Sequence, residues 1–315
     1  MPARVAVVVR TKNRAEFLRR ALADVAEQDF ADWEVIVVND GGTRKAVDDA
    51  VATSGIAGRT TVIDTVLPGG RCAAANAGIR AASAPLVVLH DDDDLWHPAF
   101  LARTVAWLDA NPSDAGVMVA TEIVFEARGR NGWVETERVP YWEGLTAITY
   151  MGLLEINRAV PISFLYRRSL HDDVGFYDET LDAVEDWEFY LRVTLHHHIG
   201  YLSAEPLAYW TQRPTVRGND GNSMFAFSDM HDRDDVIVRD AALRRWVDTN
   251  GPGLPLYIGL VERRLREDMR AMFDALLLEQ RALYDARHPL WARLRRLRNR
   301  LRSSAPRARG AAKSS

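Results

Sequence analysis

Short apolar segments rich in β-branched residues alternate with helix-like segments over the first 110 residues of the chain. RVAVVVR is apolar on both faces and, with WEVIVVND, predicts a buried strand, while TTVIDTV and PLVVLH predict a third and a fourth strand. The segments between them have helical spacing, as at Phe17, Leu18, Leu22 and Val25. Strands that alternate with helices pair in parallel and carry helices on both faces. The chain is therefore predicted to be an α/β protein with a mostly parallel sheet.

Polar clusters follow three of these predicted strands, at residues 11–14 (TKNR), 39–42 (NDGG) and 91–94 (DDDD). The carboxyl ends of parallel strands meet at one edge of a sheet, and ligands of such sheets bind beyond that edge. We therefore expect the three clusters to contribute to a single ligand site.

The four consecutive aspartates are either a solvated acidic loop or part of a site that holds positive charge. Crowded carboxylates raise one another's pKa and are costly when unpaired. Leu95, Trp96 and Pro98 follow directly and would anchor the loop. Because Mg²⁺ binds one or two carboxylates and completes its shell with substrate phosphates, the string predicts a divalent metal site shared with a phosphate ligand.

Together these motifs resemble the family 2 glycosyltransferases of the GT-A fold. The matching segments are VVVRTKNR, VVNDGG, GGRCAAANAGIR and HDDDDLWHP, in the family's order, and the resemblance runs from about residue 4 to 210. Ala75 departs from the pattern, since the family often has arginine there. The resemblance implies a Rossmann-like nucleotide-diphospho-sugar transferase domain.

The resemblance also implies roles for single residues. Asp40 would contact the nucleobase, Asp91 the ribose side, and Asp93 a Mn²⁺ or Mg²⁺ ion, with Asp94 in support. The family motif, two aspartates separated by one residue, can be aligned with the four aspartates in two ways. The alignment Asp91-x-Asp93 is preferred because it leaves Asp94, Leu95 and Trp96 in the family's flanking positions. Asp92 is expected to be the aspartate that faces water. The nucleotide-sugar site is completed by Thr11, Asn13, Arg14, Arg71, Asn76 and Asp92.

The segment AVEDWEFYLRV contains an acidic pair that, by itself, would be assigned to the wet face of a helix. By the resemblance, Asp186 would be the general base of an inverting transfer, and Glu185 would support the acceptor. A helix N-terminus lowers the pKa of a carboxyl group, so Asp186 is expected to be ionised and a weak base.

Other candidates leave two interpretations open. His196, His197, His198 and His231 could add a metal ligand, but adjacent histidines point in different directions on a helix. The loop 212–224, with Arg213 and Arg217, could close over a diphosphate or be an exposed loop. Tyr141 and Trp142 could stack on an acceptor sugar or pack in the core.

Residues 231–315 are predicted to form a helical extension of a 1–230 catalytic domain. Residues 286–315 carry ten Lys/Arg and no Asp/Glu, against a net charge of −4 for the whole chain. In the segment 287–302, leucines share one helical stripe and arginines cover the other face, which is typical of a helix on an anionic membrane surface. The alternatives are a packed helix, a nucleic-acid contact or a partly disordered end, and no nucleic-acid partner is expected.

The sequence has no apolar run of 18 residues, no signal-peptide pattern and a single cysteine, Cys72, which together favour a cytoplasmic protein, possibly peripheral to the inner face of the membrane. The predicted function is inverting transfer of a sugar from a UDP-, dTDP- or GDP-linked donor to a glycan or lipid-linked acceptor in bacterial surface-glycan assembly. The alternatives are a metal-dependent nucleotidyltransferase and a non-catalytic sugar-nucleotide-binding protein.

Overall fold

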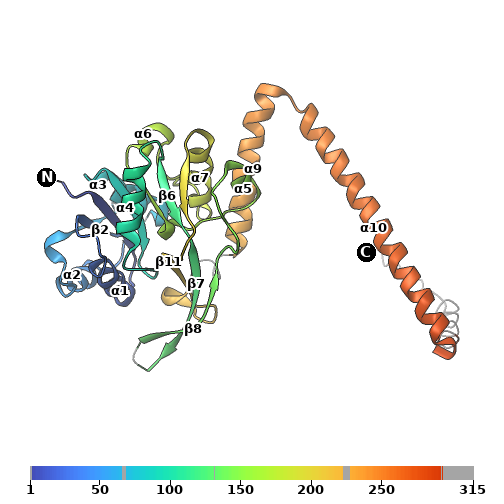
Figure 1. The fold of residues 1–315 in the computed structure, drawn as a ribbon, viewed down its shortest axis with the longest axis horizontal. Coiled ribbons are helices and arrows are strands. Elements are labelled where there is room, and N and C mark those ends of the chain that lie inside the picture. Colours follow the sequence, from blue (N-terminus) through green and yellow to red (C-terminus); the bar gives the residue numbers. More distant parts are fainter. Residues whose placement is uncertain (1, 66–68, 131, 223–227, 292, 294–315) are drawn as a thin grey trace, which may run out of the picture. The chain divides into compact units, whose positions relative to one another are not determined.

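The computed structural model describes residues 2–65, 69–130, 132–222, 228–291 and 293 (Figure 1). The chain divides into two compact units, Met1–Asp240 and Ala241–Ser315. The predicted domain boundary after residue 230 therefore falls inside the first unit. The predicted membrane-surface segment 287–302 lies outside the described residues except for 287–291 and 293.

The first unit is built on a seven-stranded sheet in the order β10-β6-β9-β4-β1-β2-β3. Every neighbouring pair is parallel except those made by β9, which runs antiparallel to β4 and to β6. The predicted mostly parallel α/β sheet is confirmed. The strands are β1 (Val5–Thr11), β2 (Trp33–Asn39), β3 (Thr60–Asp64), β4 (Leu86–Asp91), β6 (Gly116–Val119), β9 (Phe164–Arg167) and β10 (Ile199–Leu202).

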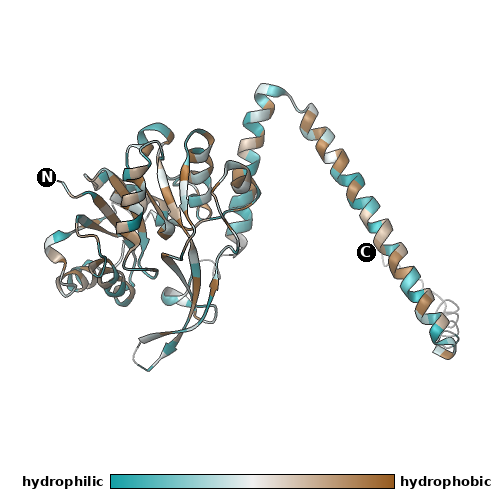
Figure 2. Cartoon of the chain, viewed as in Figure 1, coloured by the Kyte–Doolittle hydropathy of each residue, from teal (hydrophilic) through white to brown (hydrophobic). Residues whose placement is uncertain are grey.

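Helices cover both faces of this sheet, so the central strands are apolar on both sides, as the brown colour on several of them in Figure 2 indicates. In β1, Val5, Val7 and Val9 pack in one hydrophobic cluster, and Ala6 and Val8 pack in the other. The first cluster includes buried side chains of α1 (Ala15–Ala26), α2 (Arg44–Ala52) and α4 (Phe100–Ala110). The second includes those of α3 (Gly70–Ala81), α5 (Tyr150–Glu155), α6 (Leu170–Val174) and α7 (Glu185–His196).

A smaller sheet, in the order β5-β11-β7-β8, adds a second layer of strands. The apolar segment 116–129 divides at Ala120 into β6 in the central sheet and β7 in the smaller one. The strand β11 pairs with β5 directly after the aspartates, so the chain that follows β11 starts beside the acidic loop. The strands are β5 (Leu95–Trp96), β7 (Thr121–Gly129), β8 (Gly132–Pro140) and β11 (Ala208–Gln212).

Two long helices follow, α9 (Ser228–Asn250) and α10 (Gly253–Arg287). The prediction that this part of the chain is helical is confirmed. Among the described helices, none is both long enough and apolar enough to cross a membrane.

Gly78 lets α3 pack closely against the sheet, because an added Cβ would lie 2.3 Å from Val8 Cγ1 and 3.0 Å from Val38 Cγ2. We expect Gly78→Ala to lower the free energy of unfolding by about 1–3 kcal/mol, since overpacking in a rigid core outweighs the better helix propensity of alanine. Urea denaturation measures this change. Gly58→Ala is the control, because its Cβ would meet no atom within 4 Å, and an equal loss in both variants would contradict the packing argument.

Candidate active site

The register of the central sheet brings the predicted polar clusters together. Arg10 at the end of β1 pairs with Asp91 of β4, and Thr11 pairs with Asn39 of β2. Beyond these strand ends lies a cavity of about 750 Å³. Nine of the residues predicted for the site line it: Thr11, Arg14, Asp40, Arg71, Asp91, Asp92, Asp93, Glu185 and Asp186.

Two predicted nucleotide-sugar residues, Asn13 and Asn76, are not among the residues that line this cavity. Asn13 adopts a left-handed conformation with φ 55°, and its Oδ1 accepts the Thr43 N–H at 2.9 Å, which ties two strand-end turns together. The amide of Asn76 is buried; it donates to the Tyr177 carbonyl at 2.9 Å and accepts the Tyr177 N–H at 3.0 Å. Both side chains support the framework of the site.

Asp40 lies at the wall of the cavity formed by the turn after β2. Its Oδ1 accepts the Gly69 N–H at 3.0 Å, and Lys12 Nζ lies 3.7 Å from its Oδ2. The turn before α3 is thereby joined to the turn after β2. Arg71, in the first turn of α3, also lines the cavity, whereas Ala75, one helical turn later, is buried in the core.

Arg10 also lines the cavity, although it was not among the predicted site residues. Its Nε donates to Asp91 Oδ1 at 2.8 Å, and its Nη1 lies 3.6 Å from Glu185 Oε1. Burial opposes the charged form of Arg10, but Asp91 and Glu185 outweigh it and raise the pKa of its guanidinium. A charged residue that ends an apolar strand needs a buried partner, and that was the signal in the sequence.

Asp92 is buried, which corrects the expectation that it faces water. Thr11 Oγ1 donates to its Oδ2 at 2.8 Å, and Arg14 Nη1 lies 3.0 Å from its Oδ1. Burial raises the pKa of Asp92 to about 7, with Arg14 opposing and Asp93 adding to the shift.

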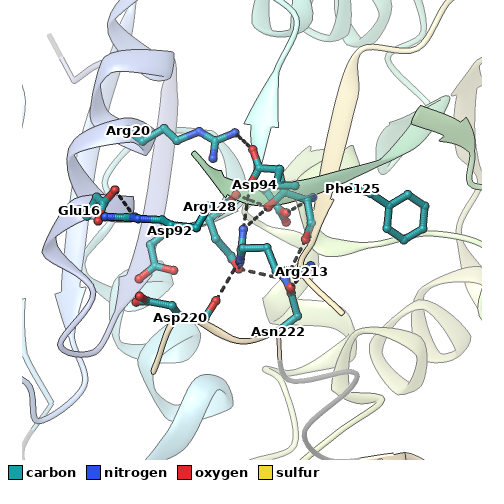
Figure 3. Close-up of polar contacts among 12 residues, drawn as sticks. Glu16, Arg20, Asp92, Asp94, Phe125, Arg128, Arg213, Asp220 and Asn222 are labelled. Atoms are coloured by element: carbon teal, nitrogen blue, oxygen red, sulfur yellow. Dashed lines mark hydrogen bonds and ion pairs between the residues drawn. The ribbon is translucent and has the colours of Figure 1, made fainter. Parts of the chain in front are cut away.

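Asp93 is held by a network of cations and amides centred on Arg213 (Figure 3). Arg213 donates to Asp93 Oδ2, and the same oxygen accepts Arg14 Nη2 at 2.7 Å and Asn222 Nδ2 at 3.2 Å. Burial would raise the pKa of Asp93, but Arg14 and Arg213 outweigh it and lower the pKa. Asp93 is therefore ionised and firmly oriented.

Arg213 is fully buried, which corrects its assignment to an exposed or mobile loop. Besides Asp93, it donates to Glu126 Oε2 at 3.0 Å and to the Asp220 carbonyl at 3.0 Å, and its guanidinium lies 4.4 Å from the centre of the Phe17 ring. Asp94 accepts the Thr211 N–H at 2.9 Å, so the acidic loop is also tied to β11. By contrast, Arg217 is exposed.

The family resemblance implies a divalent cation at this loop, and the available oxygens fit one. Within the described part of the chain, Asp93 Oδ1 and Asp91 Oδ2 make no hydrogen bond, and both residues line the cavity. Hard carboxylate oxygens suit Mg²⁺ and Mn²⁺. Among the described residues, no three His, Cys, Asp or Glu side chains form a metal cage, so a cation here would complete its shell with water or with the oxygens of a bound phosphate.

Asp186 and Glu185 open α7 after Val184, whose left-handed φ of 54° is unusual for a β-branched residue. The helix therefore starts at Glu185, and both acidic side chains are buried at the cavity. Asp186 Oδ2 accepts Asn157 Nδ2 at 3.0 Å, and its Oδ1 accepts the Trp187 N–H at 2.8 Å. Burial and then Glu185 raise the pKa of Asp186 to about 7. The Trp187 N–H at the start of the helix lowers this pKa, but burial outweighs it, so the expected net lowering is wrong.

Of the remaining candidate residues, the histidines and Tyr141, some line the cavity and others do not. His197 and His198 contact different partners, Asp173 and Asp114. His231 lines the cavity, and burial, then Arg71, lowers its pKa. Tyr141 lines the cavity together with Trp210, whose ring centre is 5.3 Å away; Trp210 was not selected from the sequence.

Comparison with known proteins identifies the family to which this arrangement belongs. Residues 6–175, more than half of the chain, match the model of Glycosyl transferase family 2. The chain belongs to glycosyl transferase family 2. The predicted family and enzyme class, a glycosyltransferase, are thereby confirmed.

Individual family 2 relatives are similar over about two thirds of the chain. The uncharacterized glycosyltransferase YwdF of Bacillus subtilis is 29% identical over 215 residues, covering 65% of this chain and 74% of YwdF. The succinoglycan biosynthesis protein ExoU of Rhizobium meliloti is 30% identical over 228 residues, covering 64% and 62%. The crystal structure of S. aureus TarS 1–349 with UDP-GlcNAc superposes with a TM-score of 0.52 at 21% identity, covering 70% of this chain and 60% of that chain. This likeness confirms the GT-A fold.

Proposed function

We propose that this family 2 glycosyltransferase is an inverting enzyme that uses Asp186 as its general base. The observation that carries the proposal is the carboxyl of Asp186, which is held at the cavity by Asn157 and the Trp187 amide and has its pKa raised to about 7. A base with a pKa near the working pH is both available and strong enough to remove a proton during attack.

In the proposed reaction, an acceptor hydroxyl attacks the anomeric carbon from the face opposite the leaving nucleoside diphosphate. The new carbon–oxygen bond forms as the bond to the β-phosphate oxygen breaks, and the hydroxyl proton moves to Asp186. Glu185, which lies within 4 Å of Arg10 and Arg71, would keep that part of the cavity polar and help to orient the acceptor.

Positive charge for the leaving diphosphate is available from Lys12, Arg14 and Arg71, which line the same cavity. Fixed cations aimed at developing charge lower a barrier without reorganising during the reaction. Asp93, with Asp91, would hold Mn²⁺ or Mg²⁺, and a bound cation would add Lewis-acid stabilisation of the diphosphate.

Relatives suggest the substrate classes. TarS has been crystallised with UDP-GlcNAc, and ExoU is named for succinoglycan biosynthesis. We therefore propose a UDP-, dTDP- or GDP-linked sugar as donor and a glycan or lipid-linked acceptor in cell-surface glycan assembly, at the cytoplasmic side.

Product analysis tests this proposal against a nucleotidyltransferase. One reaction contains the protein, nucleotide sugars and Mn²⁺, and a second contains the protein, nucleoside triphosphates, sugar 1-phosphates and Mn²⁺; the released products are separated. Release of nucleoside diphosphate supports sugar transfer or its hydrolytic side reaction, whereas release of pyrophosphate from nucleoside triphosphates would overturn it. If no donor releases nucleoside diphosphate and no donor raises the melting temperature of the protein, the result would favour a protein that does not use nucleotide sugars.

Metal removal should reduce this activity strongly. We expect chelation with EDTA to lower the rate of nucleoside diphosphate release by at least about 100-fold, because a Lewis acid at the diphosphate contributes several kcal/mol. Added Mn²⁺ should restore the rate in the wild-type chain but not in Asp93→Asn. An unchanged rate in EDTA would contradict this expectation. It would indicate that Arg14 and Lys12 stabilise the charge of the leaving diphosphate without a metal ion.

A further inference from the structure

The helix α10 carries a continuous apolar stripe with an 11-residue repeat. Leu254, Leu265 and Leu276 are 11 residues apart, as are Val261, Met272 and Leu283, while Ile258 and Met269 form a third row between them. An 11-residue repeat corresponds to 3.67 residues per turn, so the three rows stay on one face along the helix. Brown bands recur along α10 in Figure 2.

This stripe is exposed in the single chain. None of the residues of α10 is buried, and exposed fractions along the stripe range from 45% at Val261 to 73% at Met272. A helix obtains most of its stability in a protein from packing an apolar face, and large exposed apolar patches mark interaction surfaces. The stripe continues for 30 residues, about 45 Å, so we expect another apolar surface to cover it.

The charges of α10 favour a second protein helix over an anionic lipid surface. The helix carries six arginines and six acidic residues, so it has no net positive charge to attract anionic lipid. Asp268 and Glu279 are 11 residues apart and lie in one row that borders the stripe, where both would face anionic headgroups. Mixed charges beside an apolar stripe are typical of helices that pair with helices.

The borders of the stripe are complementary to each other. Arg264 and Asp268 lie along one border, and Glu262 and Arg266 lie along the other. When two copies pair in parallel and in register, each border of one helix faces the opposite border of the other. Arg264 then lies near Glu262 of the second copy, and Asp268 lies near Arg266, with the members of each pair two residues apart along the helix axis. An antiparallel pair could match Arg264 with Asp268 and Glu262 with Arg266 only about a centre near residue 265, and that pairing leaves Leu283 without a partner in α10.

We propose that α10 is a homodimerisation element that forms a parallel, in-register coiled coil with α10 of a second copy. The 11-residue repeat makes this coiled coil nearly straight or slightly right-handed. The layers at its centre are formed by Leu254, Ile258, Val261, Leu265, Met269, Met272, Leu276 and Leu283.

Sedimentation of the full chain over a concentration series tests the proposal. We expect a dimer of twice the 35.4 kDa of one chain. Leu265→Asp should weaken the dimer by about 100-fold or more, because it places two carboxylates in a dry layer. Leu278→Asp is the matched control, since it makes the same change in the same helix away from the stripe and should leave the dimer intact.

Cysteine cross-linking tests the orientation, because Cys72 is buried and leaves an introduced thiol as the reactive one. Val261→Cys alone should form a disulfide-linked dimer, as should Leu283→Cys alone. A mixture that cross-links only Val261→Cys to Leu283→Cys would overturn the parallel register. A chain that stays monomeric, a dimer that Leu265→Asp leaves intact, or a monomer that binds anionic vesicles through the stripe would overturn the proposal itself.

Discussion

Replacing Asp186 with asparagine is expected to lower the rate of sugar transfer by about 100-fold to 10,000-fold. The amide cannot take the proton of the acceptor hydroxyl, but it has nearly the same shape and can still accept the Trp187 N–H at the same position. Donor binding should therefore be almost unchanged, as measured by the shift in melting temperature with nucleoside diphosphate and Mn²⁺.

Asp182→Asn is the control for this variant. Asp182 precedes the same helix and loses a charge in the same way, but its carboxylate is exposed and pairs with Arg233 on the surface. Its activity should stay within a factor of about two, because exposed ion pairs contribute little. Equal rates in Asp186→Asn and the wild-type chain would show that another group is the base.

The pH dependence of the wild-type rate follows from the same carboxyl. Burial and Glu185 raise the pKa of Asp186 to about 7, and only the ionised form acts as a base, so kcat/KM should rise tenfold per pH unit below 7 and level off above it. Asp92 also has a pKa near 7, raised chiefly by burial, so the profile is repeated with Asp92→Asn. A midpoint that disappears with Asp92→Asn would assign the titration to the acidic loop instead.

Replacing Arg213 with methionine is expected to lower the free energy of unfolding by about 3 kcal/mol, which corresponds to about 6–12 °C in melting temperature for a unit of this size. Methionine keeps an apolar stem against the Phe17 ring but removes the charge that faces Asp93 and Glu126. The loss stays moderate because Arg14 still contacts Asp93 and Arg20 still contacts Glu126.

Arg217→Met in the same loop is the control for Arg213→Met. Its exposed guanidinium donates to the Pro214 carbonyl at 3.2 Å, so the change should stay within about 0.5 kcal/mol. Adding Glu126→Gln to Arg213→Met should recover part of the lost stability, because it removes one carboxylate left with fewer partners. Urea denaturation measures all three, and an equal, small effect of Arg213→Met and Arg217→Met would contradict the network in Figure 3.

Arg10 and Asp186 differ in how readily each could be predicted from the sequence as a site residue. Asp186 was identified because the acidic pair and its following aromatic residue stand close together in the chain and resemble the family pattern. Arg10 was passed over because its partners, Asp91 and Glu185, are 81 and 175 residues away. A local pattern can indicate that such an arginine needs a partner, but it does not identify which residue the partner is.

Asp92 and Arg213 were misassigned for a related reason. Four like charges in a row and an arginine in a polar loop both suggest exposure, since charges are costly to bury alone. Each is buried because the fold supplies partners: Thr11 and Arg14 for Asp92, and Asp93 with Glu126 for Arg213. The cost of burial is thus offset by residues that only folding brings near.

The sequence by itself determined the parallel α/β sheet, the edge at which the candidate site lies and the positions of the two acidic motifs. These follow from the alternation of apolar runs and from the geometry of parallel strands, both of which are local properties. The tertiary structure alone decided which aspartates pair with arginine and which have their pKa raised by burial. It also decided which predicted residues support the turns around the site and do not line the cavity. Those outcomes depend on distances between segments far apart in the chain, and electrostatic energies change steeply with such distances and with exclusion of water.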